Sequence, residues 1–362
     1  MYSKTINAIP LIPLLIITPM MLMGLSSMSN ISSLGGIFWK QLIWIVIAIV
    51  SLIIFYNFDY KSLPRSKVSI YVYLFSTSLL LAVFVIGKVT NGAQSWLHLG
   101  VVSFQPADLM KLALIMLLAK YFSHRHREIA NVKHLFISGF YFLIPFILVL
   151  LQPDLGSALI LLSIWGGIIF VSGASRKHII FLIIVATISF ALAWSFAFKP
   201  YQKARIVNFI HPLNDIKGGG YNAYQSTIAV GNGGAWGQGI GYGSQSRLNY
   251  LPEHETDFIF AAFLEEWGFM GGLTLITLYL LLLVYLISGI YKLENNYSII
   301  FISGLIIWLY IHIIINMGMN LGVAPVTGIP LPFVSYGGTH LLLESIMLGM
   351  AASMLRSSNK HY

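Results

Sequence analysis

Long apolar stretches alternate with short polar segments along nearly the whole chain. We identify ten stretches long enough to cross a bilayer, whose ~30 Å of hydrocarbon takes about 20 helical residues. They lie near residues 8–28, 38–57, 68–87, 106–122, 134–151, 156–173, 178–198, 258–290, 299–321 and 337–355. The pattern predicts an all-α polytopic membrane protein with about ten transmembrane helices, folded as a single membrane domain over residues 1–362.

One polar segment is far longer than the others. Residues 199–256 separate the seventh apolar stretch from the eighth and end, at the next span, in the sequence LPEHETD of residues 251–257. No other stretch is large and polar enough to handle a substrate on the water side of the membrane. The segment delivers a carboxylate, that of Asp257, to the edge of a membrane helix.

The basic residues predict the orientation of the spans. With the N-terminus in the cytoplasm, the short loops on the outer side hold only Lys40 and Lys88. The cytoplasmic segments then hold Lys4, Lys61, Arg65, Lys67, Arg125, Arg127, Lys133, Arg176, Lys177, Lys292, Arg356 and Lys360. Lys and Arg concentrate on the cytoplasmic side of membrane proteins. We therefore expect both termini inside and the insert 199–256 outside.

Composition agrees with a membrane protein and excludes several classes. The chain is 57% hydrophobic and 9% charged, against about 25% charged in soluble domains. It has no cysteine, which excludes disulfides and thiolate metal sites. The net charge of +9 follows from the basic loops and does not indicate a nucleic-acid partner. A phosphate-binding loop of the Walker type and an internal repeat are both absent, which disfavours an ATP-driven pump and a secondary transporter. We also find no cleavable signal sequence and expect the first apolar run to remain a span.

Polar, Gly- and Pro-containing sequences cluster in the predicted outer loops. These are NGAQSWLHLG (91–100), FQPAD (104–108), QPDLG (152–156) and APVTGIPLPFVSYGG (324–338). Glycine permits unusual backbone angles and close approach, and proline fixes turns. The loops either build a site together with the insert or are re-entrant segments that seal helix ends. The residues alone leave both interpretations open.

Asp257 has two interpretations as well. Thr256 or Asp257 is well placed to cap the next helix. Alternatively, a carboxylate at an apolar rim loses hydration, so that its pKa rises toward that of a useful general base, although the helix N-terminus opposes this shift. As one helix, residues 257–290 would extend about 50 Å, which exceeds the hydrocarbon thickness, so we expect a tilt or a bend at Gly268 or at Gly271-Gly272.

Other charged residues lie inside or beside the spans. Lys111 follows Asp108 by three residues, and Glu344 follows His340 by four, so each pair is either an ion pair or functional. Glu265 and Glu266 are expected near the membrane interface, paired with a neighbouring helix or a basic side chain. Oxygen-rich sites bind Mg²⁺ or Mn²⁺, and a divalent cation is an open alternative at the residues Glu253, His254, Glu255 and Asp257.

Taken together, the motifs resemble the SEDS family (shape, elongation, division and sporulation proteins), the RodA/FtsW/SpoVE group. The resemblance covers residues 90–350 in the family's order. It rests on Asn91-Gly92-Ala93 with Trp96, Phe104-Gln105-Pro106 with Lys111, Gln152-Pro153-Asp154-Leu155-Gly156, Tyr221 with Gln225-Ser226, residues 228–234, Leu251-Pro252-Glu253 with Thr256-Asp257-Phe258, Glu265-Glu266 with Gly268, and residues 327–338.

The resemblance implies a peptidoglycan glycosyltransferase in the bacterial cytoplasmic membrane with its active site facing outward. Such an enzyme polymerises lipid II, a disaccharide-pentapeptide on undecaprenyl pyrophosphate, and works with a class B penicillin-binding protein. The family's essential Asp falls on Asp257, implied here as the catalytic base. The implied positions for binding pyrophosphate or sugar are Lys111, Arg205, Trp96, Gln105, Asp108, Gln225, Ser226, Glu253 and Ser335. No cofactor is certain from the sequence, and a divalent cation, Mg²⁺ or Mn²⁺, is the open alternative.

The chain departs from the family pattern at several positions. Many members have His immediately before the Thr-Asp pair, whereas this chain has Glu255 there and His254 one place earlier. Ser95 stands where some members carry Arg, and Asp108 replaces a frequent Glu. The short termini and residues 243–246 mildly favour the RodA-like branch, but elongation, division and sporulation remain open. A lipid II flippase and a noncatalytic scaffold for the transpeptidase are the alternatives.

Overall fold

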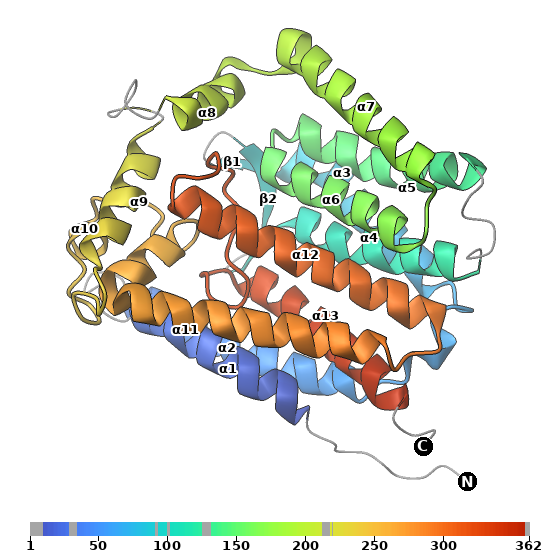
Figure 1. The fold of residues 1–362 in the computed structure, drawn as a ribbon, viewed down its shortest axis with the longest axis horizontal. Helices are drawn as coiled ribbons and strands as arrows, with labels where there is room; N and C mark the ends of the chain where they lie inside the picture. The colour runs from blue at the N-terminus through green and yellow to red at the C-terminus, as the bar shows by residue number, and fades with distance from the viewer. Residues whose placement is uncertain are drawn as a thin grey trace.

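A computed structural model describes residues 10–28, 35–90, 93–99, 102–124, 132–211, 218 and 220–358. Each of the ten predicted apolar stretches forms a helix, and the bounds agree within a few residues (Figure 1). These helices are α1 (Leu11–Ser27), α2 (Gly35–Tyr56), α3 (Val68–Ile86), α4 (Pro106–Ser123), α5 (Val132–Leu151), α6 (Leu155–Val171), α7 (Arg176–Leu192), α11 (Ile259–Ile290), α12 (Asn296–Asn320) and α13 (Gly338–Ser358). The predicted all-α membrane fold is confirmed.

Among the described residues, seven helices are long and apolar enough to cross a membrane. They are α2, α3, α5, α7 with the π-helical turn Ala193–Ala197, α11, α12 and α13. The helices α1 and α6 are apolar but shorter, and α4 carries the charges of Asp108, Lys111 and Lys120. The number of spans and their orientation therefore remain predictions.

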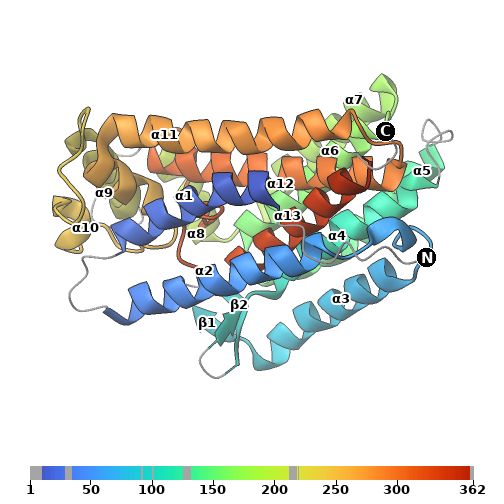
Figure 2. The same cartoon turned by 90° about the horizontal axis from the view of Figure 1, so that it is seen from below.

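The polar loops contain structure that the apolar pattern did not predict. Between α3 and α4 the chain forms a small antiparallel sheet of β1 (Lys88–Thr90), β2 (Ala93–Leu99) and β3 (Val102–Phe104), with β2 in the middle. The insert contains α8 (Pro200–Ile210), α9 (Tyr221–Asn232) and α10 (Ser244–Arg247). Figure 2 shows the sheet, α8, α9 and α10 toward one end of the helical bundle, which we call the insert end.

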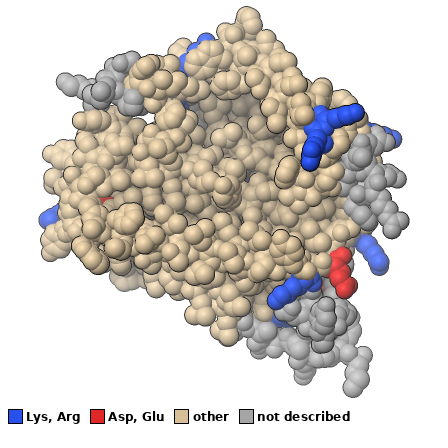
Figure 3. Space-filling model, in the orientation of Figure 1, with Lys and Arg blue, Asp and Glu red and all other residues tan. Residues whose placement is uncertain are grey.

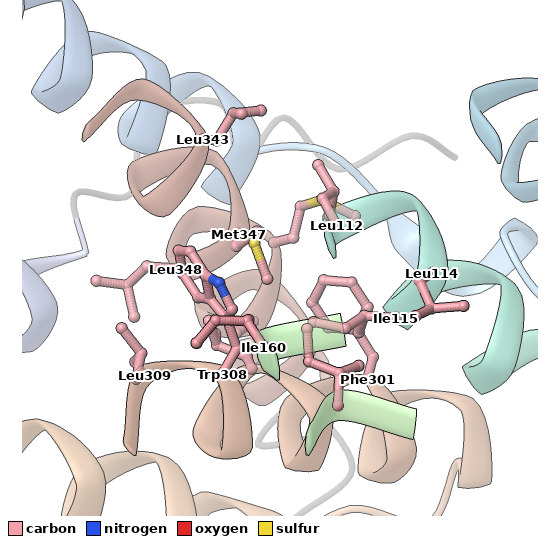
Figure 4. Packing of buried hydrophobic residues seen from close by; sticks show 14 of the residues in the cluster. Leu112, Leu114, Ile115, Ile160, Phe301, Trp308, Leu309, Leu343, Met347 and Leu348 are labelled. Carbon is pink, nitrogen blue, oxygen red and sulfur yellow. The ribbon is translucent and has the colours of Figure 1, made fainter. Parts of the chain in front are cut away.

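The centre of the bundle is formed by α4, α6, α12 and α13. The side chains of α4 are almost all buried, and α12 buries Phe301, Trp308 and Leu309 against its neighbours (Figure 4). The helix α7 is the opposite case, because none of its residues is buried. On the face in Figure 3, Lys and Arg lie near the periphery and the middle is free of charged residues. This distribution suits a surface that faces hydrocarbon.

The predicted bend in α11 lies at Gly268. This residue has φ 66° and ψ −169°, angles that interrupt the helix and that glycine adopts readily because it lacks a Cβ. Gly271 and Gly272, the other candidates, lie inside the helix beyond the break. The bend divides α11 into a short segment, Ile259–Trp267, and a longer one that ends at Ile290.

Candidate active site

Asp257 lies at the insert end, immediately before α11, and its main chain is held by α12. The carbonyl oxygen of Asp257 accepts hydrogen bonds from the side-chain amides of Asn316 (2.9 Å) and Asn320 (3.0 Å). The Asn316 amide also donates to the carbonyl of Ile329, at 2.7 Å. Both asparagines are fully buried. The helix α12, which also contacts the loop before α13 through Asn316, thus fixes the backbone from which the Asp257 side chain extends.

Neither Thr256 nor Asp257 caps α11, contrary to the capping interpretation. The N-cap residue is Phe258, without a side-chain capping bond, and the Thr256 hydroxyl donates to the Glu253 carboxylate at 2.9 Å. The side-chain oxygen of Asn320 accepts instead from the amide of Ala261, at 3.0 Å. An asparagine from another helix therefore satisfies a free amide of the first turn, which leaves the Asp257 carboxylate available for other contacts.

Burial decides the protonation of Asp257. The pKa of this carboxyl is raised from 3.8 to about 7, chiefly by loss of hydration; the Glu253 and Asp154 carboxylates also raise it, whereas Arg205 lowers it. The side chain is densely surrounded by protein but keeps partial access to solvent. The opposing effect of the helix N-terminus does not prevail. The result is a carboxyl group that can gain or lose a proton near neutral pH.

The groups around Asp257 come from three segments that are distant in the sequence, together with the nearby Glu253. Arg205 belongs to α8 in the insert, and Asp154 precedes α6. The Gln105 amide donates to the Asp154 carboxylate at 2.8 Å, whose other oxygen caps α6 by accepting from Ser157 N at 2.9 Å. The structure thus places Arg205, Glu253 and Gln105, three of the sequence-predicted binding residues, around Asp257 or one contact away from it.

The loop 321–337 also borders Asp257. Gly328 has φ 74°, and a Cβ built on it would lie 3.4 Å from a carboxylate oxygen of Asp257. The Ser335 hydroxyl donates to the Thr256 carbonyl and accepts from Leu331 N, both at 2.7 Å. Ser335 is therefore placed to position the Thr256-Asp257 backbone. The loop both seals helix ends and contributes to the site, so the two interpretations of the outer loops are compatible.

Lys111 and Asp108 belong to a second, buried cluster. The Lys111 ammonium donates to Asp108 Oδ1 at 2.7 Å, and Lys111 is only 2% exposed. His340 lies between two carboxylates, with Nδ1 3.2 Å from Asp108 Oδ2 and Nε2 2.8 Å from Glu344 Oε1. The other Glu344 oxygen accepts from Phe333 N at 2.8 Å. Both ion pairs expected from the sequence are present, joined into one chain of contacts that ends at the loop before α13.

The remaining predicted residues lie on other elements. Ser226 is buried in α9 and donates to the carbonyl of Asn320 at 2.8 Å, so it supports the end of α12. Gln225 is partly exposed in α9, and Trp96 is partly exposed in β2. His254 is buried, with Nδ1 2.9 Å from the Leu251 carbonyl. Among the described residues, no group of three or more acidic or histidine side chains has an arrangement that could hold a metal ion.

Asn316, Asn320 and Asp154 are site residues that the predicted set omits. A signal existed for the asparagines, since two amides four residues apart lie on one face of an otherwise apolar span. Buried amides need partners, and here the partners are the backbone groups around Asp257. Asp154 was part of a motif but gave no indication that its carboxylate would lie near Asp257.

The fold and the site define an integral membrane protein with an ionisable carboxyl group and an arginine at one end of its helical bundle. A family model described as cell cycle protein, covering FtsW, RodA and SpoVE, matches residues 4–360. The chain belongs to this family, as its motifs predicted.

Named relatives support the same class. The chain is 35% identical to peptidoglycan glycosyltransferase MrdB of Escherichia coli over 78% of this chain and 76% of that protein. It is 38% identical to probable peptidoglycan glycosyltransferase FtsW of Haemophilus influenzae, over 77% and 71%. A solved chain from a study of polymerization and crosslinking by a peptidoglycan synthase complex aligns with a TM-score of 0.82 and 29% identity, covering 95% of this chain and 97% of that one. The prediction of a glycosyltransferase of cell-wall synthesis in a multi-pass bacterial membrane protein is confirmed.

Proposed function

We propose that this protein polymerises lipid II into glycan strands at the outer face of the cytoplasmic membrane. The observation that carries the proposal is the Asp257 carboxyl, whose pKa lies near 7, beside a guanidinium at the membrane edge. A general base is most effective when its pKa lies near the working pH. The lipid tail of the substrate suits a site that opens at the end of a membrane bundle.

Asp257 acts in this proposal as the general base. Its carboxylate takes the proton from a sugar hydroxyl as that oxygen bonds to the anomeric carbon of a second substrate. The bond from this carbon to the pyrophosphate oxygen breaks, and the negative charge leaves on undecaprenyl pyrophosphate. Arg205 stabilises that charge, because a guanidinium binds phosphate oxygens with two parallel hydrogen bonds. Glu253 and Gln105 are the neighbouring groups available to the sugars.

Lys111 and Asp108 have a structural role in this proposal. Lys111 is sealed from solvent and already neutralised by Asp108, so binding of pyrophosphate would require breaking a buried ion pair. Through His340 and Glu344, the pair supports the loop before α13, and Ser335 of that loop holds the Thr256 carbonyl. The cluster thus helps to position the backbone beside Asp257 without touching the substrate.

The proposed partner is a class B penicillin-binding protein, a transpeptidase that crosslinks the new strands. Its support is the structural similarity to a chain from a peptidoglycan synthase complex. The similarity to MrdB and the similarity to FtsW are close in identity, so they do not separate a role in elongation from one in division. Depletion of the protein distinguishes the two roles, because loss of elongation rounds rod-shaped cells whereas loss of division makes filaments.

The purified protein in detergent, supplied with lipid II alone, provides the test of the proposed activity. A polymerase makes glycan strands under these conditions, visible as a ladder after gel electrophoresis. A flippase has no compartments between which to move lipid and leaves lipid II unchanged. A scaffold also makes no glycan and would retain its function after substitution of Asp257. Absence of glycan from a folded, monodisperse preparation would contradict the proposal.

The rate of polymerisation should rise with pH through about 7 and level off above it. The base must be ionised to accept a proton, and burial holds the pKa of Asp257 near 7, so its ionised fraction increases over that range. Initial rates between pH 5.5 and 8.5 at saturating lipid II measure this dependence. A rate that is flat across this range would assign the proton transfer to another group.

A further inference from the structure

The break in α11 is occupied by a segment of the insert. Because Gly268 interrupts the helix, carbonyls before it and amides after it lose their usual partners. Residues 234–239, which we call the docked loop, supply new ones. The amides of Phe269 and Met270 donate to the carbonyls of Gly234 (2.9 Å) and Ala235 (3.1 Å), and the amides of Gln238 and Gly239 donate to the carbonyls of Glu265 (2.9 Å) and Glu266 (3.0 Å).

Glycines allow this close approach of two backbones. A Cβ on Gly268 would lie 2.2 Å from the amide nitrogen of Gly237, and a Cβ on Gly237 would lie 2.0 Å from the carbonyl oxygen of Glu266. Both glycines also have positive φ. No other residue type fits either position without moving the backbone, so the docked loop and the break are in fixed register.

Two buried carboxylates extend the attachment beyond the docked loop. Glu265 accepts from the amides of Gln245 (2.9 Å) and Ser246 (3.2 Å), and Glu266 accepts from the amide of Gly241 at 2.9 Å. Gln245 and Ser246 belong to α10, so Glu265 pairs with a neighbouring helix, which is one of the two expected arrangements. The whole segment from residue 234 to residue 246 is thereby fastened to α11.

Two observations place the break at a boundary of the hydrocarbon layer: the length of α11 beyond it and the position of the end of α1. Residues 268–290 extend about 34 Å at 1.5 Å per residue, close to the ~30 Å thickness of that layer. Ser27, the last residue of α1, lies near the Glu266 carboxylate beside the break. A second apolar helix therefore ends at the same level. The break lies near the N-terminal end of α11, and in Figure 1 α9 and α10 adjoin that end of the helix.

Large aromatic side chains are exposed at this level. Trp236 in the docked loop is 78% exposed, Tyr242 is 69% exposed and Phe269 is 63% exposed. Further along α11 the exposed side chains are aliphatic, including Leu273, Ile276, Leu280, Leu281 and Val284. Trp and Tyr collect where hydrocarbon meets water, whereas aliphatic residues face the acyl chains. The aromatic group thus continues a lipid-facing surface up to the headgroups.

We propose that the docked loop is an interfacial anchor, in which Trp236 inserts among the lipid headgroups of the outer leaflet. Through the bonds across the break, the anchor fixes the depth of α11 and therefore of Asp257, which immediately precedes this helix. Depth matters because the pyrophosphate of a lipid-linked substrate lies at the headgroup level. The choice of leaflet rests on the proposed function, whereas the location at a membrane boundary does not.

The depth of position 236 can be measured directly, because the chain contains no cysteine. Single variants Trp236→Cys and Leu280→Cys carry the same fluorophore in bilayers with quenchers at the headgroup or at the acyl-chain end. We expect headgroup quenchers to be most effective at position 236 and acyl-chain quenchers at position 280. The proposal would be overturned if neither membrane quencher affected the fluorophore at position 236 and aqueous iodide quenched it as strongly as it quenches the free dye in solution. The proposal would also be overturned if the fluorophore became protected from iodide only after a class B transpeptidase was added, because the docked loop would then contact that protein and not the lipid.

Activity supplies a second, independent test. Trp236→Ala should lower the polymerisation rate several-fold in proteoliposomes but leave it unchanged in detergent, where no planar interface exists. Trp236→Tyr, which keeps an interfacial aromatic group, should restore the rate in proteoliposomes. Equal loss in both environments would indicate a folding defect and contradict the anchor. Wild-type protein that is inactive in both would contradict the proposed enzyme but would leave the quenching result standing.

Discussion

Asp257→Asn should abolish polymerisation of lipid II while leaving the fold intact. Asn has nearly the same shape as Asp but cannot accept the proton of the attacking hydroxyl. Loss of a general base costs about 100- to 10,000-fold in rate. The main-chain bonds from Asn316 and Asn320 involve the Asp257 carbonyl, which the substitution keeps. Single-turnover rates with purified variant and lipid II measure the effect.

Glu255→Gln is the matched control, because it neutralises a carboxylate two residues away. Glu255 contributes its carbonyl to Tyr336 N and does not appear among the charges that shift the pKa of Asp257. We expect it to retain most of the wild-type rate. A near-native rate for Asp257→Asn, or equal losses for the two variants, would remove Asp257 from the role of base.

The Asp257→Asn variant should also be at least as stable as the wild type above neutral pH. The folded-state pKa of about 7 lies above the ordinary value of 3.8, so the folded protein binds this proton more tightly than the unfolded chain. Ionisation therefore destabilises the fold progressively as pH rises from about 4 to about 7, and the full loss persists above that. Asn carries no charge, so the Asp257→Asn variant avoids this loss of stability. Such a cost at a functional residue is common, because catalytic groups are selected for reactivity.

Lys111→Met should destabilise the protein strongly. The substitution removes the ammonium that neutralises a buried carboxylate, and breaking a buried ion pair in this way typically costs about 3–5 kcal/mol. Asp108 would retain only His340 as a charged partner in the cluster. We expect a clear drop in the thermal unfolding temperature in detergent, together with loss of activity that follows from unfolding.

The double variant Asp108→Asn with Lys111→Met distinguishes a structural role of Lys111 from a role in binding pyrophosphate. It removes the lone carboxylate and should recover much of the stability lost in the single variant. Lys120→Met, on the same helix, is the control, because Lys120 donates to the Ser66 carbonyl and leaves no buried carboxylate behind. A Lys111→Met protein with native stability and a raised KM for lipid II would instead support direct binding of pyrophosphate by Lys111.

The helices could be predicted from sequence because hydrocarbon imposes a simple rule of length and apolarity. The bend at Gly268 was among the predicted positions for the same reason, since residues 257–290 exceed the membrane thickness. The sheet β1–β3 and the helices of the insert were not predicted, because their formation depends on packing at the insert end and not on an apolar run.

The contacts of the site were less accessible to sequence reasoning. The spacing of Asp108 and Lys111 predicted their ion pair, because both lie on one helix. The links from Asp108 to His340 and from Asp257 to Asn316 join residues far apart in the chain, and no local pattern encodes them. Capping at Thr256 or Asp257 was a sound local inference. It was wrong because the side-chain oxygen of Asn320, from another helix, accepts the hydrogen bond of a free amide in the first turn of α11.

Asn320 limits which side chains evolution or design could place at its position. Its amide group donates to the Asp257 carbonyl and to the Asn316 carbonyl, its side-chain oxygen accepts from Ala261 N, and its own carbonyl accepts from Ser226. Aspartate would lose both donors, serine would be too short, and glutamine would add a methylene at a fully buried position. The stereochemical demand of one buried amide thus leaves a single acceptable residue type where three segments meet.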